Sequence, residues 1–219
     1  MDKRSFNEEL EGAYGVFSAL TYVEGGAEAE VRQGKNIVDA AVEAGVQHFV
    51  YSSVSGADKL TGIPFFDSKH QNEVYIRSKD VPFTFLRPAH SMENFNMWPR
   101  CKAIRDGKLV FPLPMDRRLQ LIAIDDIGFF AAMAFDRKDE MLGKSYELAG
   151  DELTMPEVAQ RFSAHLGREV RFVQLPLDEL KAMDLEYHLL ARWLRDEGYR
   201  ADIPSVRRMP PACSRSTHG

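Results

Sequence analysis

The sequence predicts an α/β protein with a parallel sheet, because short apolar runs alternate with stretches of helical periodicity as far as Pro88. "VFSAL" (Val16 to Leu20) and "HFVYSS" are short apolar runs, typical of strands that are buried on both faces. "VPFTFLRP" predicts a third strand that stops at Pro88, since proline cannot donate a ladder hydrogen bond. Strands joined by helices pair in parallel through right-handed crossovers.

Two helices are expected between these strands. From about Glu28 to Ala44 apolar residues recur at helical spacing, and Gly45 follows where a left-handed cap is wanted. The second helix is "FFDSKHQNEVYIR", Phe65 to Arg77. The predicted order is therefore strand, helix, strand, helix, strand.

The second half of the chain has a looser pattern. We expect a helix over Phe95 to Arg105, strands at "KLVFP" and "KSYELAG", and a strand that passes into a helix at Asp125-Asp126. "TMPEVAQRFSAHLG" predicts a helix with Thr154 as its N-cap. Residues 1–95 are thus predicted to form one domain, 96–205 a smaller α+β lobe, and 206–219 a disordered tail.

Composition excludes several function classes. The net charge of -5 gives no basic field for direct nucleic-acid binding. Cys101 and Cys213 have no partner spacing, and the six histidines form no metal-ligand pattern, so neither a disulfide framework nor a metal site is expected. No apolar run is long enough to span a membrane. A reducing cytoplasm fits this cysteine content best.

The expected ligand site is the edge of the sheet where the parallel strands end, because ligands of open α/β sheets gather there. Three segments follow the three predicted strands: Thr21-Tyr22, Ser52 to Gly56, and Ala89 to Asn94.

Several longer stretches resemble one family: "LEGAYGVFSAL", "EAEVRQGKNIVDAAVEAGVQHFVYSSVSGAD", "TGIPFFDSKHQNEVYIRSKDVPFTFLRPAHSMENF", "IAIDDIGFFAAMAF" and "WLRDEGYRADIP". Together they cover most of residues 5 to 205, and the chain resembles the NmrA-like family of atypical short-chain dehydrogenases. The resemblance implies NAD(P) binding, with NADP as the expected cofactor, on an incomplete Rossmann-like parallel sheet with a smaller α+β C-terminal lobe.

The resemblance also implies which residues contact the dinucleotide. The lysine of "FDSK", Lys69, is expected to reach the nicotinamide ribose, where an ammonium can donate to both hydroxyls. The remaining candidates follow the first and third strands: Leu20, Thr21, Tyr22, Ser91, Met92, Glu93 and Asn94.

Each candidate has a structural alternative. Lys69 could be a solvated helix lysine, and Ser91 with Asn94 could simply start a helix. Arg87 could be a structural ion-pair residue, and His90 is weak evidence for acid-base chemistry.

A conventional reductase of the parent superfamily needs a tyrosine one helical turn before the lysine, and Phe65 occupies that position. Tyr75 lies about 240° around the helix from Lys69, so it is no substitute. Ser52 and Ser53 could polarise a carbonyl, although serines there more often satisfy local backbone groups. No catalytic residue is assigned.

The glycine-rich phosphate turn of the family has no counterpart in the sequence. Gly12 and Gly15 precede a strand, whereas a phosphate turn lies between a strand and a helix. The resemblance implies that a strand-helix-strand-helix-strand portion is absent before Met1. "VFSAL" would then be an exposed edge strand, which predicts self-association.

Three functions remain open. The leading hypothesis is an NAD(P)(H)-binding sensor or regulator that acts on a protein partner when cofactor occupancy orders the loops around residues 21–26 and 89–95. The second is an NAD(P)H-dependent quinone or carbonyl reductase that takes its proton from water. The third is a remnant that binds no dinucleotide.

Overall fold

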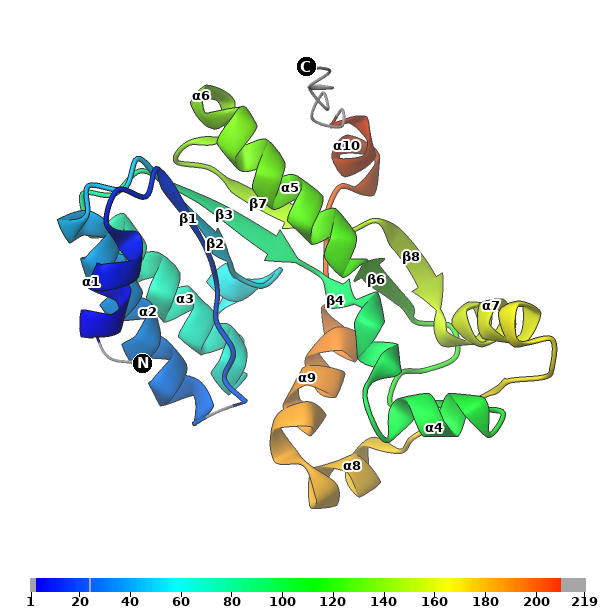
Figure 1. Cartoon of the computed structure of the whole chain (residues 1–219). Helices are drawn as coiled ribbons and strands as arrows, with labels where there is room; N and C mark the ends of the chain where they lie inside the picture. Colours follow the sequence, from blue (N-terminus) through cyan, green and yellow to red (C-terminus); the bar gives the residue numbers. More distant parts are fainter. Residues whose placement is uncertain (1–2, 24, 210–219) are drawn as a thin grey trace.

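The main sheet has four parallel strands in the order β1 (Gly15–Ala19), β2 (His48–Ser52), β3 (Phe83–Pro88) and β7 (Ser145–Leu148) (Figure 1). This is a computed structural model, which describes residues 3–23 and 25–209. The three strands expected in the first half are confirmed, and so is the "KSYELAG" strand. The chain is an α/β protein on a parallel sheet, as predicted.

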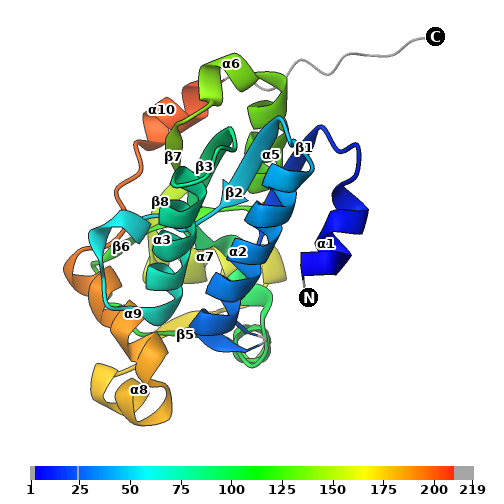
Figure 2. The ribbon, with the colours of Figure 1, turned by 90° about the vertical axis from the view of Figure 1, so that its left-hand side faces the viewer.

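Helices cover both faces of this sheet. Three lie on one face: α1 (Lys3–Leu10), α2 (Gly26–Glu43) and α3 (Pro64–Arg77) (Figure 2). The other face packs against α5 (Ile124–Asp136), which α6 (Lys138–Met141) follows. Phe49 and Tyr51 of β2 are buried on the α2 and α3 side, whereas Val50 between them is buried on the α5 side. This alternation explains why β2 is a continuous apolar run.

The second half forms a lobe of two small sheets. β4 (His90–Ser91), β6 (Arg118–Ile122) and β8 (Asp151–Thr154) make one, and β5 (Lys108–Phe111) and β9 (Arg171–Gln174) make the other. Its helical segments are η2 (Met92–Asn96), α4 (Arg100–Arg105), α7 (Met155–Leu166), α8 (Leu177–Met183), α9 (Leu185–Asp196) and α10 (Ile203–Arg208). A short 3-10 helix, η1 (Ala57–Lys59), follows β2 in the first half.

One expected helix of this lobe is interrupted. The stretch Phe95 to Arg105 was expected to be continuous, but η2 ends at Asn96 and α4 starts at Arg100. Met97 between them is extended, with φ -73° and ψ 141°. Trp98 precedes Pro99, and proline disfavours helical backbone at the residue before it. The interruption therefore follows from the proline.

The caps of α7 agree with the sequence. Thr154 Oγ1 accepts a hydrogen bond from the Glu157 backbone N–H, and Glu157 accepts one from the Thr154 backbone N–H. Gly167 follows the helix with a positive φ of 66°, which costs glycine no steric strain. Both ends of α7 are thus fixed by local sequence.

The two halves of the chain are interleaved. β7 belongs to the predicted 96–205 segment, yet it pairs with β3 in the sheet of the 1–95 segment. The division at residue 95 stays a prediction.

The expected disorder of 206–219 is wrong for its first residues, because α10 extends to Arg208 and Val206 is buried against the α5 side of the sheet. Residues 210–219 lie outside the described part of the chain.

β1 is an edge strand, as the sequence predicted. Among the described residues, only β2 pairs with it. Phe17 in the middle of β1 is 43% exposed, although Val16 and Ser18 on its other face are buried. An apolar strand edge is therefore open to solvent.

Candidate functional site

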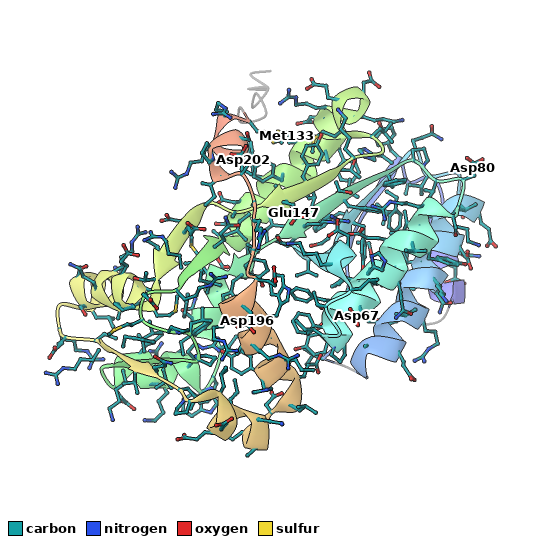
Figure 3. All side chains as sticks on the ribbon, turned by 180° about the vertical axis from the view of Figure 1, so that it is seen from behind. Asp67, Asp80, Met133, Glu147, Asp196 and Asp202 are labelled. Carbon is teal, nitrogen blue, oxygen red and sulfur yellow. The ribbon has the colours of Figure 1, made fainter. Side chains whose placement is uncertain are left out.

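The candidate site lies at the edge where the parallel strands end. α3 runs back against the strands, so its first turn lies at that edge and its last turn at the opposite one. Asp67, in the first turn of α3, and Asp80, before β3, mark these two ends in Figure 3. Lys69 is two residues beyond Asp67, and it therefore lies near the end of the sheet where the site was expected.

Lys69 is a buried side chain with partners in the protein, not a solvated one. Its residue is 9% exposed. The ammonium Nζ lies 2.6 Å from the Leu20 carbonyl oxygen, to which it donates, and 2.5 Å from Glu30 Oε1. The Tyr51 ring lies beneath it, with Nζ 5.8 Å from the ring centroid. Lys69 thus joins α3 to α2 and to the loop after β1.

Glu30 is the residue that the sequence analysis missed. It lies on α2, is 0% exposed, and accepts a hydrogen bond of 2.5 Å from the Ser68 hydroxyl in addition to the Lys69 ion pair. The signal was present in the sequence: Glu30 lies four residues before Gly34 and eight before Val38, on the buried stripe of the helix. A carboxylate on an apolar stripe indicates a buried cationic partner.

The two helices come very close at this cluster. A Cβ at Gly34 would lie 2.2 Å from Asn72 Oδ1, so a larger residue there would force the Asn72 amide to move. Asn72 donates to the Tyr51 hydroxyl at 3.0 Å, and its amide also lies 3.5 Å from the Glu30 carbonyl oxygen. The close contact between α2 and α3 therefore helps to fix the positions of Glu30 on α2 and Lys69 on α3.

Phe65 occupies the place expected of a catalytic tyrosine, and it is packed as a hydrophobic residue. Its ring stacks on Tyr22 with centroids 5.1 Å apart and planes 15° apart. Phe66 continues the aromatic contacts to Trp193 of α9. Tyr75 donates to Asp39 at 2.8 Å, on a different side of the helix. Neither Phe65 nor Tyr75 can serve as a proton donor next to Lys69.

The surroundings of Tyr22 are acidic. Burial, followed by the negative charges of Glu186, Asp184 and Glu30, raises the pKa of the Tyr22 phenol. Burial also raises the pKa of Glu186, a hydrogen bond from the Phe65 backbone N–H opposes this rise, and Asp184 adds to it. A lysine that lowers the pKa of a tyrosine is the reductase arrangement. The environment here shifts the pKa of the Tyr22 phenol in the opposite direction, upward.

The two other residues of the β1 loop are bound locally. Leu20 contributes its carbonyl oxygen to Lys69, as described above. The Thr21 hydroxyl accepts a hydrogen bond of 3.2 Å from the Val23 backbone N–H, which forms a local turn. The structure therefore brings Leu20, Thr21 and Tyr22 together with Lys69.

The second group of candidates, Ser91 to Asn94, lies at the start of α5. Glu93 accepts hydrogen bonds from the Ser91 hydroxyl at 2.7 Å and from the Ile124 backbone N–H at 3.1 Å. Burial would raise the pKa of Glu93, but these two hydrogen bonds outweigh it and lower that pKa. A carboxylate at a helix N-terminus is favoured by the helix dipole. Glu93 therefore fixes the β4 segment to α5.

The rest of this second group is also packed into the lobe. Met92 packs against the apolar core of the second lobe, and the Asn94 carbonyl oxygen accepts a hydrogen bond of 2.7 Å from Arg100. Ser91 is the N-cap residue of η2, but its side chain makes no capping hydrogen bond. Within the described residues, no hydrogen bond or ion pair connects this group to Lys69.

Arg87 is the structural ion-pair residue that the sequence left open. It is 5% exposed and binds Glu73 through two hydrogen bonds of 2.9 and 2.7 Å. Asp58 and Glu147 complete its partners, at 2.8 and 3.1 Å. Burial alone would raise the pKa of Asp58, but the Arg87 hydrogen bond and charge lower it.

His90 is a neutral core residue. Its ring packs edge-on against Phe111 at 5.7 Å and lies 6.0 Å from Phe95. Burial, with the nearby charge of Arg100, lowers the pKa of His90 to about 3. These contacts give His90 a packing role, and none of them indicates acid-base chemistry.

Gly15 has a packing role as well. It begins β1, and a Cβ there would lie 2.5 Å from Phe135 Cε1. Ser53 is buried, and its hydroxyl has no hydrogen-bond partner.

Other features of the described chain lie away from this edge. Among residues 3–23 and 25–209, no cluster of three potential metal ligands is found. Within the same residues, no helix is long and apolar enough to cross a membrane. A cavity of about 230 Å³ is lined by Met133, Arg137 and Tyr146 among others, beside the first residues of β7. It shares no lining residue with the candidate site.

The parallel sheet and the charged pair at its C-terminal edge define a Rossmann-like α/β protein. The comparisons with known proteins narrow this class. The model of the NmrA-like family matches residues 1–201, and the chain belongs to that family.

Three similar proteins illustrate the range of the family. The nitrogen metabolite repression protein nmr of Neurospora crassa is 32% identical over 164 residues, which cover 68% of this chain and 33% of that protein. The NAD(P)H azoreductase of Xenophilus azovorans is 29% identical over 154 residues, covering 69% and 52%. The crystal structure of NmrA, a negative transcriptional regulator, in complex with NAD superposes with a TM-score of 0.65 at 26% identity, covering 79% and 56%. The chain thus spans about half or less of these relatives.

Proposed function

We propose that this chain binds the nicotinamide-ribose half of NAD(P) at the C-terminal edge of its sheet and serves as a nucleotide sensor instead of a turnover enzyme. The observation that carries the proposal is the pairing of Lys69 with the β1 loop, beside a Phe65 that is stacked on Tyr22. These contacts support a role for Lys69 as the lysine of a cofactor clamp, and Phe65 stands where a reductase pair would need a tyrosine.

The likeness to NmrA supports this proposal. That regulator was crystallised with NAD, and its fold matches 79% of this chain. Cofactor occupancy would order the loops at residues 21–26 and 89–95 and change the surface offered to a regulatory protein partner. The free thiol of Cys101 fits a reducing cytoplasm.

The test compares binding with turnover. Fluorescence titration of NADPH into the chain, with the Lys69→Met variant beside it, is expected to show binding that depends on Lys69. Incubation with NADPH and a quinone is expected to leave the 340 nm absorbance of the cofactor unchanged. Absence of NADPH and NADP binding in the wild-type chain would establish the third hypothesis, a remnant without cofactor affinity, and overturn the proposal.

A reductase is the second candidate, and the azoreductase relative favours it. Hydride would pass directly from the cofactor to a quinone or similar carbonyl, and the proton would come from water. Steady oxidation of NADPH in the presence of a quinone would favour this function over the sensor.

Self-association through β1 is a further proposal about partners. Phe17 is exposed on an unpaired strand edge, and such edges pair readily with a second copy. Light scattering after size exclusion is expected to show a dimer or larger species that Phe17→Lys converts to a monomer. Val74→Lys, at an exposed apolar position of α3, is the matched control and should leave the size unchanged. A wild-type monomer at high concentration would contradict the proposal.

A further inference from the structure

The Lys69 ammonium is neutralised before any ligand arrives, and this affects what it can bind. An ammonium has three N–H donors. One donates to the Leu20 carbonyl oxygen at 2.6 Å, and the ammonium also forms an ion pair with Glu30 Oε1 at 2.5 Å. The Lys69 side chain is 11% exposed. Lys69 therefore meets a ligand with its charge already balanced by Glu30 and with one donor already used by Leu20.

Glu30 is fixed in this position by contacts of its own. Its second carboxylate oxygen accepts from the Ser68 hydroxyl at 2.5 Å, and its residue is fully buried. Ser68 has a single hydroxyl proton, and both of its acceptors, Glu30 at 2.5 Å and the Phe65 carbonyl oxygen at 3.1 Å, belong to the protein. A buried carboxylate that is held from two sides will not swing away from the ammonium.

The charged groups around Lys69 and Tyr22 are mostly acidic. Glu30 balances the charge of Lys69, and Asp184 and Glu186 are close enough to raise the pKa of Tyr22. Within the described residues, no further cation is paired with Lys69, Glu30 or Tyr22. An incoming phosphate or carboxylate would meet acidic groups and would have to compete with Glu30. A neutral hydroxyl needs only one free N–H of the Lys69 ammonium and no excess positive charge.

We propose that Glu30 is a positioning residue that makes Lys69 a hydroxyl-selecting donor and excludes anions from this end of the site. The inference deepens the proposed function and rests on it. It predicts that the position beside Lys69 takes a neutral sugar hydroxyl and not a phosphate group.

The first experiment needs no ligand. In ¹⁵N-detected spectra of the lysine side chains, wild-type protein is expected to show one Nζ resonance protected from exchange with water, identified by its loss in Lys69→Met. Glu30→Gln should remove that protection, since the isosteric amide no longer pairs with the charge. Glu28→Gln, at an exposed glutamate of the same helix, should leave it intact. Persistence of the protected resonance in Glu30→Gln would overturn the proposal.

The second experiment measures selectivity by calorimetric titration with two probes, reduced nicotinamide riboside, which carries no charge, and inorganic phosphate. Wild-type protein and Glu28→Gln are expected to bind the riboside and to give no heat with phosphate. Glu30→Gln should bind phosphate at least about tenfold more tightly than wild type, and Lys69→Met should abolish that gain. A structural defect alone would weaken both probes and would not reverse the preference.

Wild-type protein gives a further check that does not depend on how well Glu30→Gln folds. Phosphate binding by wild type that is lost in Lys69→Met would overturn the proposal directly. Failure of the riboside to bind wild type, with the protected Nζ resonance still dependent on Glu30, would refute the proposed function alone and leave the control of Lys69 by Glu30 established.

Discussion

Two buried cations, Arg87 and Lys69, lie near one helix and differ in how many of their donors are used. Arg87 makes four hydrogen bonds to three carboxylates. Two of these hydrogen bonds go to Glu73 of α3. Lys69, four residues before Glu73 on the same helix, has one carboxylate and one carbonyl oxygen as partners. The first cation is saturated and serves the fold, whereas the second retains a donor for a ligand.

The comparison also explains His90. Arg87 and Lys69 are each buried in contact with carboxylates. His90 is buried beside Arg100 and has no carboxylate partner in the described chain, and its pKa falls to about 3. Burial without a counter-charge therefore shifts the His90 ring toward its neutral form.

The largest expected effect comes from breaking the saturated cluster. Arg87→Met leaves Glu73 as a buried carboxylate without its main partner, and we expect a loss of about 3–5 kcal/mol in the free energy of unfolding. Guanidinium unfolding monitored by circular dichroism measures it. The double variant Arg87→Met, Glu73→Leu removes both charges and should recover most of the loss. A double variant as unstable as the single one would show that shape, not charge, matters at this position.

The next effect is a pH dependence from His90. The folded pKa of about 3 lies below the ordinary value of 6.5, so the unfolded chain binds one more proton between these values. The stabilisation is complete above pH 6.5 and is lost as the pH falls toward 3, by about 1.4 kcal/mol per pH unit.

Urea unfolding at pH 7, 6 and 5 should show this slope reduced in His90→Gln relative to wild type. His165→Gln, at an exposed histidine, is the control and should keep the full slope. His48 contributes in the same direction, because burial and then the charge of Lys138 lower its pKa to about 4. Equal slopes in wild type and His90→Gln would mean that His90 is charged in the core.

A smaller effect is expected on ligand affinity. One charged hydrogen bond is worth roughly 1.5–3 kcal/mol, so loss of the free Lys69 donor should weaken NADP binding by about tenfold or more. Comparing Glu30→Gln with the Lys69→Met, Glu30→Gln double variant avoids an unpaired Glu30. Identical NADP affinities of these two proteins would place the cofactor elsewhere.

The smallest effect should come from Arg77, which approaches Glu73 at 3.3 Å but is 41% exposed. Exposed pairs contribute about 0–1 kcal/mol, and the Arg77 guanidinium also packs 4.6 Å from the Phe85 ring centroid. Arg77→Ala is expected to lower the free energy of unfolding by about 1 kcal/mol or less. A loss as large as that of Arg87→Met would erase the distinction between the saturated cluster and its surface neighbour.

Sequence reasoning located the strands well and the site only in part. "HFVYSS" and "VPFTFLRP" were recognised because both faces of β2 and β3 are buried, and β1 was correctly placed at the sheet edge. The roles of Glu30 and Glu93 were missed, since their partners, Lys69 and the start of α5, are far away in the chain.

The sequence by itself determined the order of strands and helices as far as Pro88, the caps of α7, and the absence of a tyrosine at position 65, because each depends on neighbouring residues. Only the tertiary structure decided that Lys69 is neutralised by Glu30 and that Arg87 is saturated. These pairs join residues 39 and 14 positions apart, and the close contact of α2 with α3 and of α3 with β3 creates them. Local pattern fixes which side chains are available, and packing fixes which donors remain free.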